Sequence, residues 1–412
     1  MNQLQSARDR KRQKFSTARS SDILVISKPD MYYYAVDAIQ SAQAAFDSGN
    51  FPAARVLLEA HTKDPRALAL LSRVYTQLRF PEKALSSAQR AAQLAPTDPT
   101  VQHTLALYYA QSGQRAEAAK WEARFADSPT ADPSASLRAA LLFAEVKKWP
   151  EAIRYGQLAL TKQDRPELRA MLANAYEATA QPDEAIAQYR ALLRLEPYAE
   201  DSHAKFGQAL LRMARFNEAT AELEQSVRTF DKSPQLQLAL GVAYYAQRRF
   251  TDAGDRFLLV ISLAPDIPQP YIFLSRMMDQ LPDQMPAIRK AAEAWYQMER
   301  LSGWPPYVYA KALQAAGAPD DDIKLLLIQA VERDDRAWEF DFELGQVFER
   351  QRNFTAAAKE YQSAIAINAQ VPEIHYRLAR IYDRLNQPLK AEHERAIHKQ
   401  LLAKPANKGG MQ

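Results

Sequence analysis

The sequence predicts an all-α fold made of repeated helix pairs, and three observations indicate this. Only 11 of the 412 residues are glycine, so we expect few of the tight turns that β-sandwiches and barrels require. Apolar residues recur at i, i+3, i+4 and i+7 in segments such as 168–180 and 183–195, which is the period of a helix. Finally, an alanine returns about every 34 residues, which indicates an internal repeat.

The recurring alanine marks the second helix of each predicted pair. It is found at Ala54, Ala84, Ala118, Ala152, Ala185, Ala219, Ala253, Ala287, Ala357 and Ala391. The interval from Ala287 to Ala357 covers two periods, so we expect a degenerate unit at roughly residues 304–337. A small residue at this position lets two antiparallel helices approach closely, and an aromatic residue one turn away fills the remaining space. A proline near the end of a unit then stops the second helix.

One unit carries most of a known repeat pattern. Between Pro166 and Pro197 the sequence contains Leu172-Ala173, Tyr176, Ala185, Tyr189 and the closing proline. The tetratricopeptide pattern is W-x2-L-G-x2-Y, then A-x3-F, then P, so only the leading tryptophan is missing and Ala173 replaces the glycine. The chain therefore resembles the tetratricopeptide repeat family over about residues 32–404. The resemblance implies a right-handed α-solenoid superhelix of about eleven helix-turn-helix units.

The predicted organisation has five parts. They are a basic N-terminal arm (1–31), regular repeats (32–267), degenerate repeats rich in proline and methionine (268–337), C-terminal repeats with a capping helix (338–404) and a tail (405–412). Residues 268–337 are either decayed repeats whose gaps methionine fills, or a bend or adaptable partner site.

The N-terminal arm contains an apolar run that is a candidate for assembly. Its residues are Ile23, Leu24, Val25 and Ile26. The run either folds back onto the first helices of its own chain or docks onto a neighbouring subunit.

The resemblance implies that the first helix of each pair lines a concave groove, through repeat positions 2, 5, 6, 9 and 12–13. The candidate partner residues at these positions are Arg73, Asn174, Lys205, Arg212, Tyr245, Arg276, Arg350, Tyr376 and Arg380. Equivalent positions hold His103, Gln208, Gln346 and Arg384. This mixed basic and aromatic lining suits an extended peptide or a helix that carries acidic residues. The alternative is a solvated helix face without a ligand.

This sequence lacks the residues of the dicarboxylate clamp that chaperone-binding family members carry. The clamp needs Lys at position 5 and Asn at position 9 of one repeat, Asn at position 6 of the next, and Lys and Arg in a third. Asn174 occupies a position 9, but Ala170 and Lys205 stand where the clamp needs Lys and Asn. Gln235 and Ala239 stand at the last two positions. We therefore do not expect this chain to bind an acidic chaperone C-terminus.

The sequence predicts no catalysis, no cofactor and no metal site. It contains no cysteine, its six histidines lack ligand spacing, and the glycine-rich phosphate and nucleophile motifs do not occur. The run Asp320-Asp321-Asp322 is explained as a helix cap. A net charge of +4 gives little support to nucleic-acid binding. No apolar run approaches the ~18 residues of a membrane span, so we expect no transmembrane segment.

These observations predict a non-catalytic scaffold that binds other proteins or peptides in its groove. Two alternatives stay open. One is a structural subunit that self-assembles into a homo-oligomer, homopolymer or filament through the arm and the solenoid surfaces. The other is an assembly factor for a bacterial envelope or secretion complex, because segment 237–250 resembles bacterial family members. No signal peptide is readable, which predicts a cytoplasmic protein, or an extracytoplasmic or extracellular one if residue 1 is a processed start.

Overall fold

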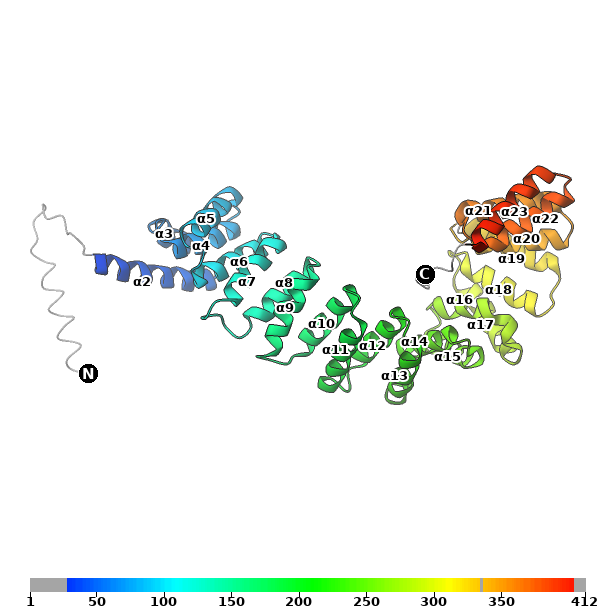
Figure 1. Cartoon of the computed structure of the whole chain (residues 1–412), viewed down its shortest axis with the longest axis horizontal. Helices are drawn as coiled ribbons and strands as arrows, with labels where there is room; N and C mark the ends of the chain where they lie inside the picture. The colour runs from blue at the N-terminus through cyan, green and yellow to red at the C-terminus, as the bar shows by residue number, and fades with distance from the viewer. Residues whose placement is uncertain (1–27, 334–335, 404–412) are drawn as a thin grey trace, which may run out of the picture. The chain divides into compact units, whose positions relative to one another are not determined.

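The described part of the chain is helical. The computed structural model describes residues 28–333 and 336–403, with side chains from residue 38 onward. These residues form α-helices and two short 3-10 helices, and they contain no strand (Figure 1). The predicted all-α fold is therefore confirmed. The assembly candidates Ile23, Leu24, Val25 and Ile26 and the tail at 405–412 lie outside the described residues.

The chain divides into two compact units, Met1–Gln181 and Pro182–Gln412. The helices of the first unit are α2 (Lys28–Asp47), α3 (Phe51–Glu59), α4 (Pro65–Gln77), α5 (Pro81–Leu94), α6 (Pro99–Gln111), α7 (Arg115–Ala126), α8 (Ala135–Glu145), α9 (Trp149–Leu160) and α10 (Pro166–Ala178). The second unit begins with α11 (Pro182–Leu195), α12 (Glu200–Arg212), α13 (Phe216–Thr229), α14 (Pro234–Ala246), α15 (Phe250–Leu263) and α16 (Gln269–Met277). It continues with the 3-10 helices η1 (Met278–Gln280) and η2 (Pro282–Gln284), then α17 (Met285–Met298), α18 (Trp304–Ala315), α19 (Asp320–Arg333), α20 (Trp338–Arg350), α21 (Phe354–Ile367), α22 (Pro372–Arg384) and α23 (Pro388–Ala403).

Within each unit a helix packs against its successor and against the corresponding helix of the next pair. In the first unit α4 packs on α5 and on α6, and in the second unit α12 packs on α13 and on α14. The twenty-two described α-helices match the predicted number of about eleven pairs. Each pair has an apolar face that only its neighbours cover.

The alanine position of the second helices lies in the core, as the repeat predicts. The alanines at 0–1% exposure are Ala54, Ala84, Ala118, Ala152, Ala185, Ala219, Ala253, Ala357 and Ala391. The assignment of Ala287 to this position was wrong, because Ala287 is exposed and the next residue, Ile288, is only 1% exposed. In α19 the same position holds Ile323, at 2% exposure. Isoleucine thus replaces alanine in the two units where the alanine pattern failed.

The turns inside the pairs are tight although glycine is scarce. The first helix of a described pair ends at a residue with positive φ, at Gly49, Arg79, Gly113, Lys147, Ala180, Ala214, Arg248, Gly317, Arg352 and Asn386. In α4, for example, the Phe80 N–H donates to the Tyr75 carbonyl at 2.9 Å and the Arg79 N–H donates to the Thr76 carbonyl at 3.2 Å, which is a Schellman motif. Most of these left-handed positions hold residues other than glycine, which the low glycine content did not lead us to expect.

The one first helix without such an ending is α16. Two 3-10 turns follow it, and between them Leu281 is 2% exposed. The Gln284 amide of η2 reaches back to α15, where it donates to the Asp255 carboxylate at 2.5 Å. Met277 and Met278 are 1% and 3% exposed, so their side chains fill the core at this irregular turn. The next pair, α18 and α19, returns to a turn with positive φ at Gly317.

Candidate partner groove

Four successive first helices of the second unit open onto one cavity of about 550 Å³. The helices are α14, α16, α18 and α20, which Figure 1 labels in chain order. The residues that line the cavity are Tyr245, Ser275, Arg276, Asp279, Tyr307, Lys311, Trp338, Glu339, Phe342 and Glu343. We call this cavity the four-helix groove. It combines aromatic rings with charges of both signs, and its volume exceeds those of four other cavities in the described part of the chain, which measure about 370–410 Å³.

Helix α20 supplies the largest share of the four-helix groove because of its helical period. Trp338 and Phe342 are one turn apart, and so are Glu339 and Glu343, so all four project from one side of the helix. The opposite side carries Phe340, which is 0% exposed and packs in the core. The core contacts of α20 therefore fix the direction in which the groove residues point.

The charges in the four-helix groove are largely paired with one another. Arg276 on α16 lies 3.4 Å from the Glu339 carboxylate on α20. Lys311 on α18 donates to Glu343 Oε1 at 2.7 Å. Burial, and then the nearby Glu343 carboxylate, raise the pKa of Tyr307, so its phenol stays protonated and keeps its capacity to donate a hydrogen bond.

The structure brings only some of the predicted groove residues together. Tyr245 and Arg276 both line the four-helix groove. Arg350 and Arg380 line a second cavity of about 370 Å³, together with Arg352, Arg384, Glu349 and Phe354. Arg350 is held there by Asp320, at 2.8 Å.

The remaining predicted residues do not share a cavity with these. Lys205 pairs with Asp201 one turn away on α12. Tyr376 is 43% exposed. The Arg380 guanidinium lies over the Tyr376 ring, 5.7 Å from the ring centroid. Arg212 on α12 is exposed in the second unit.

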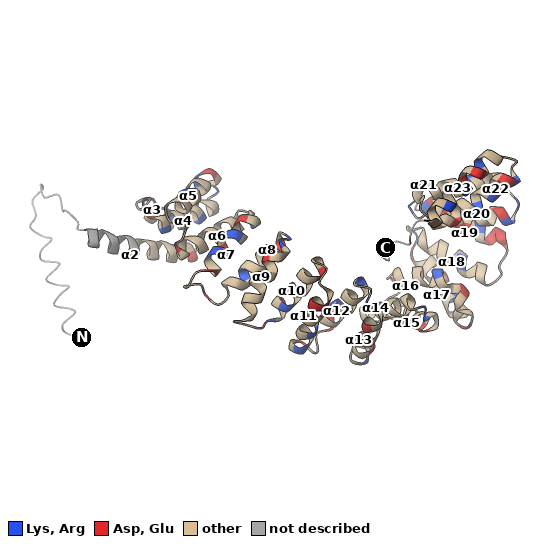
Figure 2. Cartoon of the chain, in the orientation of Figure 1, with Lys and Arg blue, Asp and Glu red and all other residues tan. Residues whose placement is uncertain are grey.

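Arg73 and Asn174 belong to the first unit, on α4 and α10. Arg73 is not a free groove cation, because its guanidinium stacks over the Phe46 ring at 4.4 Å and burial lowers its pKa against the opposing effect of Asp47. Acidic and basic side chains are interspersed along the helices of each unit (Figure 2). The expected basic lining is thus neutralised in part by carboxylates from the same chain.

Sequence reasoning missed most of the four-helix groove, although a signal was available. Glu339, Phe342 and Glu343 stand at repeat positions 2, 5 and 6 of α20, the same positions that selected the other candidates. Tyr307 and Lys311 were missed for a different reason, since the unit that holds them was interpreted as degenerate. Its helices α18 and α19 pack as a regular pair, which places both side chains in the groove.

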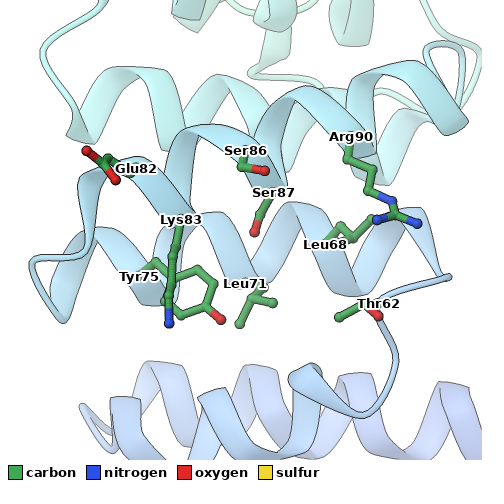
Figure 3. Close-up of a pocket in the computed structure, with 9 residues that line it drawn as sticks. All are labelled: Thr62, Leu68, Leu71, Tyr75, Glu82, Lys83, Ser86, Ser87 and Arg90. Carbon is green, nitrogen blue, oxygen red and sulfur yellow. The ribbon is translucent and has the colours of Figure 1, made fainter.

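The first unit contains a separate cavity of about 390 Å³ between α4 and α5. Figure 3 shows Lys83 of α5 extending beside the Tyr75 ring of α4, while Arg90 and Thr62 lie at the other end of the cavity. The Lys83 Nζ is 5.7 Å from the Tyr75 ring centroid. None of the predicted partner residues lines this cavity, so we do not assign a function to it.

Two further observations concern the chemistry of the described residues. Among residues 28–333 and 336–403, no three His, Cys, Asp or Glu side chains gather where they could hold a metal ion. Within the same ranges, no helix has both the length and the apolar character of a membrane span.

Comparison with known proteins supports the repeat assignment. Two family models for the tetratricopeptide repeat match the chain, one at residues 204–266 and 308–372 and one at residues 166–198. Over these residues the chain is a tetratricopeptide repeat protein. Tetratricopeptide repeat proteins are in general non-catalytic scaffolds for protein interactions.

Several solved structures match the chain at low sequence identity. A structure of Naa15/Naa10 bound to HypK-THB is 13% identical, with 91% of this chain and 69% of that chain covered and a TM-score of 0.49. Yeast Tom70 is 13% identical, with 90% and 93% covered and a TM-score of 0.43. The C-terminal part of a TPR repeat-containing protein from Cytophaga hutchinsonii is 18% identical, with 65% and 96% covered and a TM-score of 0.43. A comparison with curated protein sequences found no match.

Proposed function

We propose that this tetratricopeptide repeat protein is a non-catalytic scaffold that binds a protein partner in the four-helix groove. The observation that carries the proposal is the convergence of aromatic and charged side chains from α14, α16, α18 and α20 on one cavity. Aromatic residues and arginine are enriched where protein interfaces gain most of their binding energy. A partner segment lying across four first helices would contact several repeats at once.

Site-specific photocrosslinking tests this proposal. We would replace Tyr245, which lines the groove, by p-benzoylphenylalanine and irradiate cells that express the protein. The matched control places the same group at Tyr198, which is 83% exposed and lies between α11 and α12, outside the groove. We expect a discrete adduct with another protein from position 245 but not from position 198.

A blocking variant makes the test specific. Asp279 is exposed on η1 and lines the groove, so Asp279→Arg adds bulk and reverses the charge at its mouth without disturbing the core. Asp283→Arg makes the same change at an exposed residue of η2 that does not line it. We expect Asp279→Arg to abolish the adduct from position 245 and Asp283→Arg to leave it unchanged. Equal adducts in both variants would contradict the proposal.

The two alternatives predicted from the sequence give different results in the same experiment. A self-assembling subunit would crosslink to a second copy of itself, and its proposed assembly run from Ile23 to Ile26 lies outside the described residues. An assembly factor for an envelope or secretion complex would crosslink to components of that complex. Mass spectrometry of the adduct separates these outcomes.

A further inference from the structure

We infer that the four-helix groove receives an arginine side chain of the partner, an inference that rests on the proposed function. Three carboxylates line the groove, from Asp279, Glu339 and Glu343, against the two cations Arg276 and Lys311. The excess charge of the lining is therefore negative. Within the part of the chain that the structure describes, no Lys, Arg or His forms an ion pair with Asp279. The acidic partner expected from the predicted basic lining does not match this balance.

Glu343 provides a second and independent observation. Its side chain is only 10% exposed, and Oε1 accepts a hydrogen bond from Lys311. The other oxygen, Oε2, is buried and has no hydrogen-bond donor among the described residues. A buried charged oxygen without a donor is unfavourable. Because Oε2 is closed to solvent, the Glu343 side chain must rotate toward the groove to accept a hydrogen bond from a ligand. A ligand that brings N–H groups to the rotated carboxylate would remove this cost, which a hydrocarbon or a carboxylate ligand cannot do.

The aromatic part of the lining favours a guanidinium over an ammonium ion. The Trp338 and Phe342 rings have centroids 5.8 Å apart and are tilted by 56°, and both are half-buried. A guanidinium stacks flat on such a ring while its N–H fork reaches carboxylates at its edge. The chain already makes this kind of contact with the same ring from a residue outside the lining, because the Arg377 guanidinium lies 5.7 Å from the Phe342 ring centroid.

Saturation-transfer NMR with Nα-acetyl-arginine amide tests the inference, since the method detects weak binding of a single side chain. The comparison probes are Nα-acetyl-citrulline amide, which has the same shape without the charge, and Nα-acetyl-glutamate amide. We expect saturation of the arginine methylenes to exceed that of the citrulline methylenes by at least about fivefold. Equal signals from arginine and citrulline, or a stronger signal from glutamate, would overturn the inference.

Three variants localise the effect to the groove. Glu343→Gln removes the charge of the buried carboxylate, and we expect it to weaken binding of the arginine probe by about tenfold. Lys311→Met removes the internal partner of Glu343, and we expect it to strengthen binding, an effect that misfolding cannot imitate. Glu332→Gln changes an exposed carboxylate of α19 that does not line the groove, and we expect no change. An unchanged or weaker signal in Lys311→Met argues against the assignment.

The outcomes for the two proposals can be separated. An adduct from position 245 without a preference for arginine would leave the scaffold function intact and reject the arginine assignment. A preference for arginine without any adduct from position 245 would reject the scaffold function at this groove.

Discussion

Gly241 of α14 lies directly against the ring of Phe257 on α15. A methyl group on the Gly241 Cα would come within 2.6 Å of the Phe257 Cε1 atom, far closer than carbon atoms approach without overlap. Phe257 cannot move aside easily, because it is 0% exposed and stacks on Phe273 with ring centroids 5.1 Å apart. The absence of a side chain at residue 241 therefore determines how closely the two helices of this pair pack.

We expect Gly241→Ala to lower the free energy of unfolding by about 1–3 kcal/mol, the range for overpacking a core. Urea unfolding of the full chain, followed by circular dichroism, measures the change. Phe257→Ala removes the obstructing ring atoms and serves as the second variant of a double-mutant cycle; leucine would not, since Leu223 obstructs Gly207 in the same way one repeat earlier. In the Phe257→Ala background, we expect alanine at residue 241 to be neutral or stabilising, because alanine favours the helix over glycine. Additive effects would contradict the contact.

The left-handed turns predict a stabilising substitution. Ala214 ends α12 with φ 56°, a conformation that is unfavourable for residues with a Cβ atom. We expect Ala214→Gly to raise the free energy of unfolding by up to about 1 kcal/mol and the melting temperature by about 2 °C. Ala221 is exposed inside α13, and there the same change should lower the stability by about 1 kcal/mol. Shifts of the same sign in the two variants would refute the explanation.

Asp98 makes the first unit sensitive to acid. Partial burial opposes ionisation of Asp98, but hydrogen bonds from Arg66 and from the Val101 and Thr100 N–H groups outweigh it, so the pKa of Asp98 is lowered. The Arg66 Nη2 is 2.8 Å from the carboxylate, and the Thr100 N–H donates at 2.8 Å. A lowered folded-state pKa contributes stability above the unfolded pKa of about 3.9, and that stability is lost as the pH falls through the folded value.

The corresponding experiment compares wild type with Asp98→Asn in thermal melts between pH 7 and pH 2. Asparagine still caps α6 but does not ionise, so we expect the difference in stability between the two proteins to shrink as the pH falls below about 4. Asp98→Ala should lose the cap as well and be about 1 kcal/mol less stable than Asp98→Asn at every pH. A difference between wild type and Asp98→Asn that grows on acidification would exclude this role.

A buried carboxylate in the first unit predicts strong coupling between two residues. Glu122 on α7 is 2% exposed and accepts a hydrogen bond from the Arg138 Nε on α8 at 2.7 Å. His103 Nδ1 on α6 lies 3.2 Å from the same carboxylate. We expect Arg138→Met to destabilise the protein by about 2–4 kcal/mol, because it leaves a buried charge without its main partner. Adding Glu122→Gln should recover part of that loss, and chemical denaturation of the four proteins measures the coupling.

The helix pairs could be predicted from the sequence because their packing rule is local. One small residue per unit must face the partner helix, so Ala185, Ala219 and Ala253 return at nearly equal intervals and are buried. The rule failed at Ala287 for a physical reason. A buried isoleucine occupies the same place in two units, Ile288 after an irregular turn and Ile323 after a regular one. The alanine beside Ile288 then provides a false match to the repeat.

The turns were less predictable than the helices. Glycine is the usual residue at a left-handed helix ending, so the scarcity of glycine gave no indication of these turns. Arg79, Lys147 and Arg352 adopt that conformation here, because the closing backbone hydrogen bonds and the packing of two helices compensate for the local strain. The conformational preference of a residue type does not include these tertiary contributions to the stability of the turn.

The sequence by itself determined the fold class, the family and the number and order of the helix pairs, because these depend on periodic contacts between residues close in the chain. Only the tertiary structure decided the chemistry of the groove. Arg276, one of the residues that suggested a basic surface, meets Glu339 across 63 residues. Lys311, which the sequence did not single out, meets Glu343 across 32. The net charge of the groove is the sum over side chains that the stacking of helices brings together. No single repeat contains all of these side chains, so the charge cannot be read from one repeat alone.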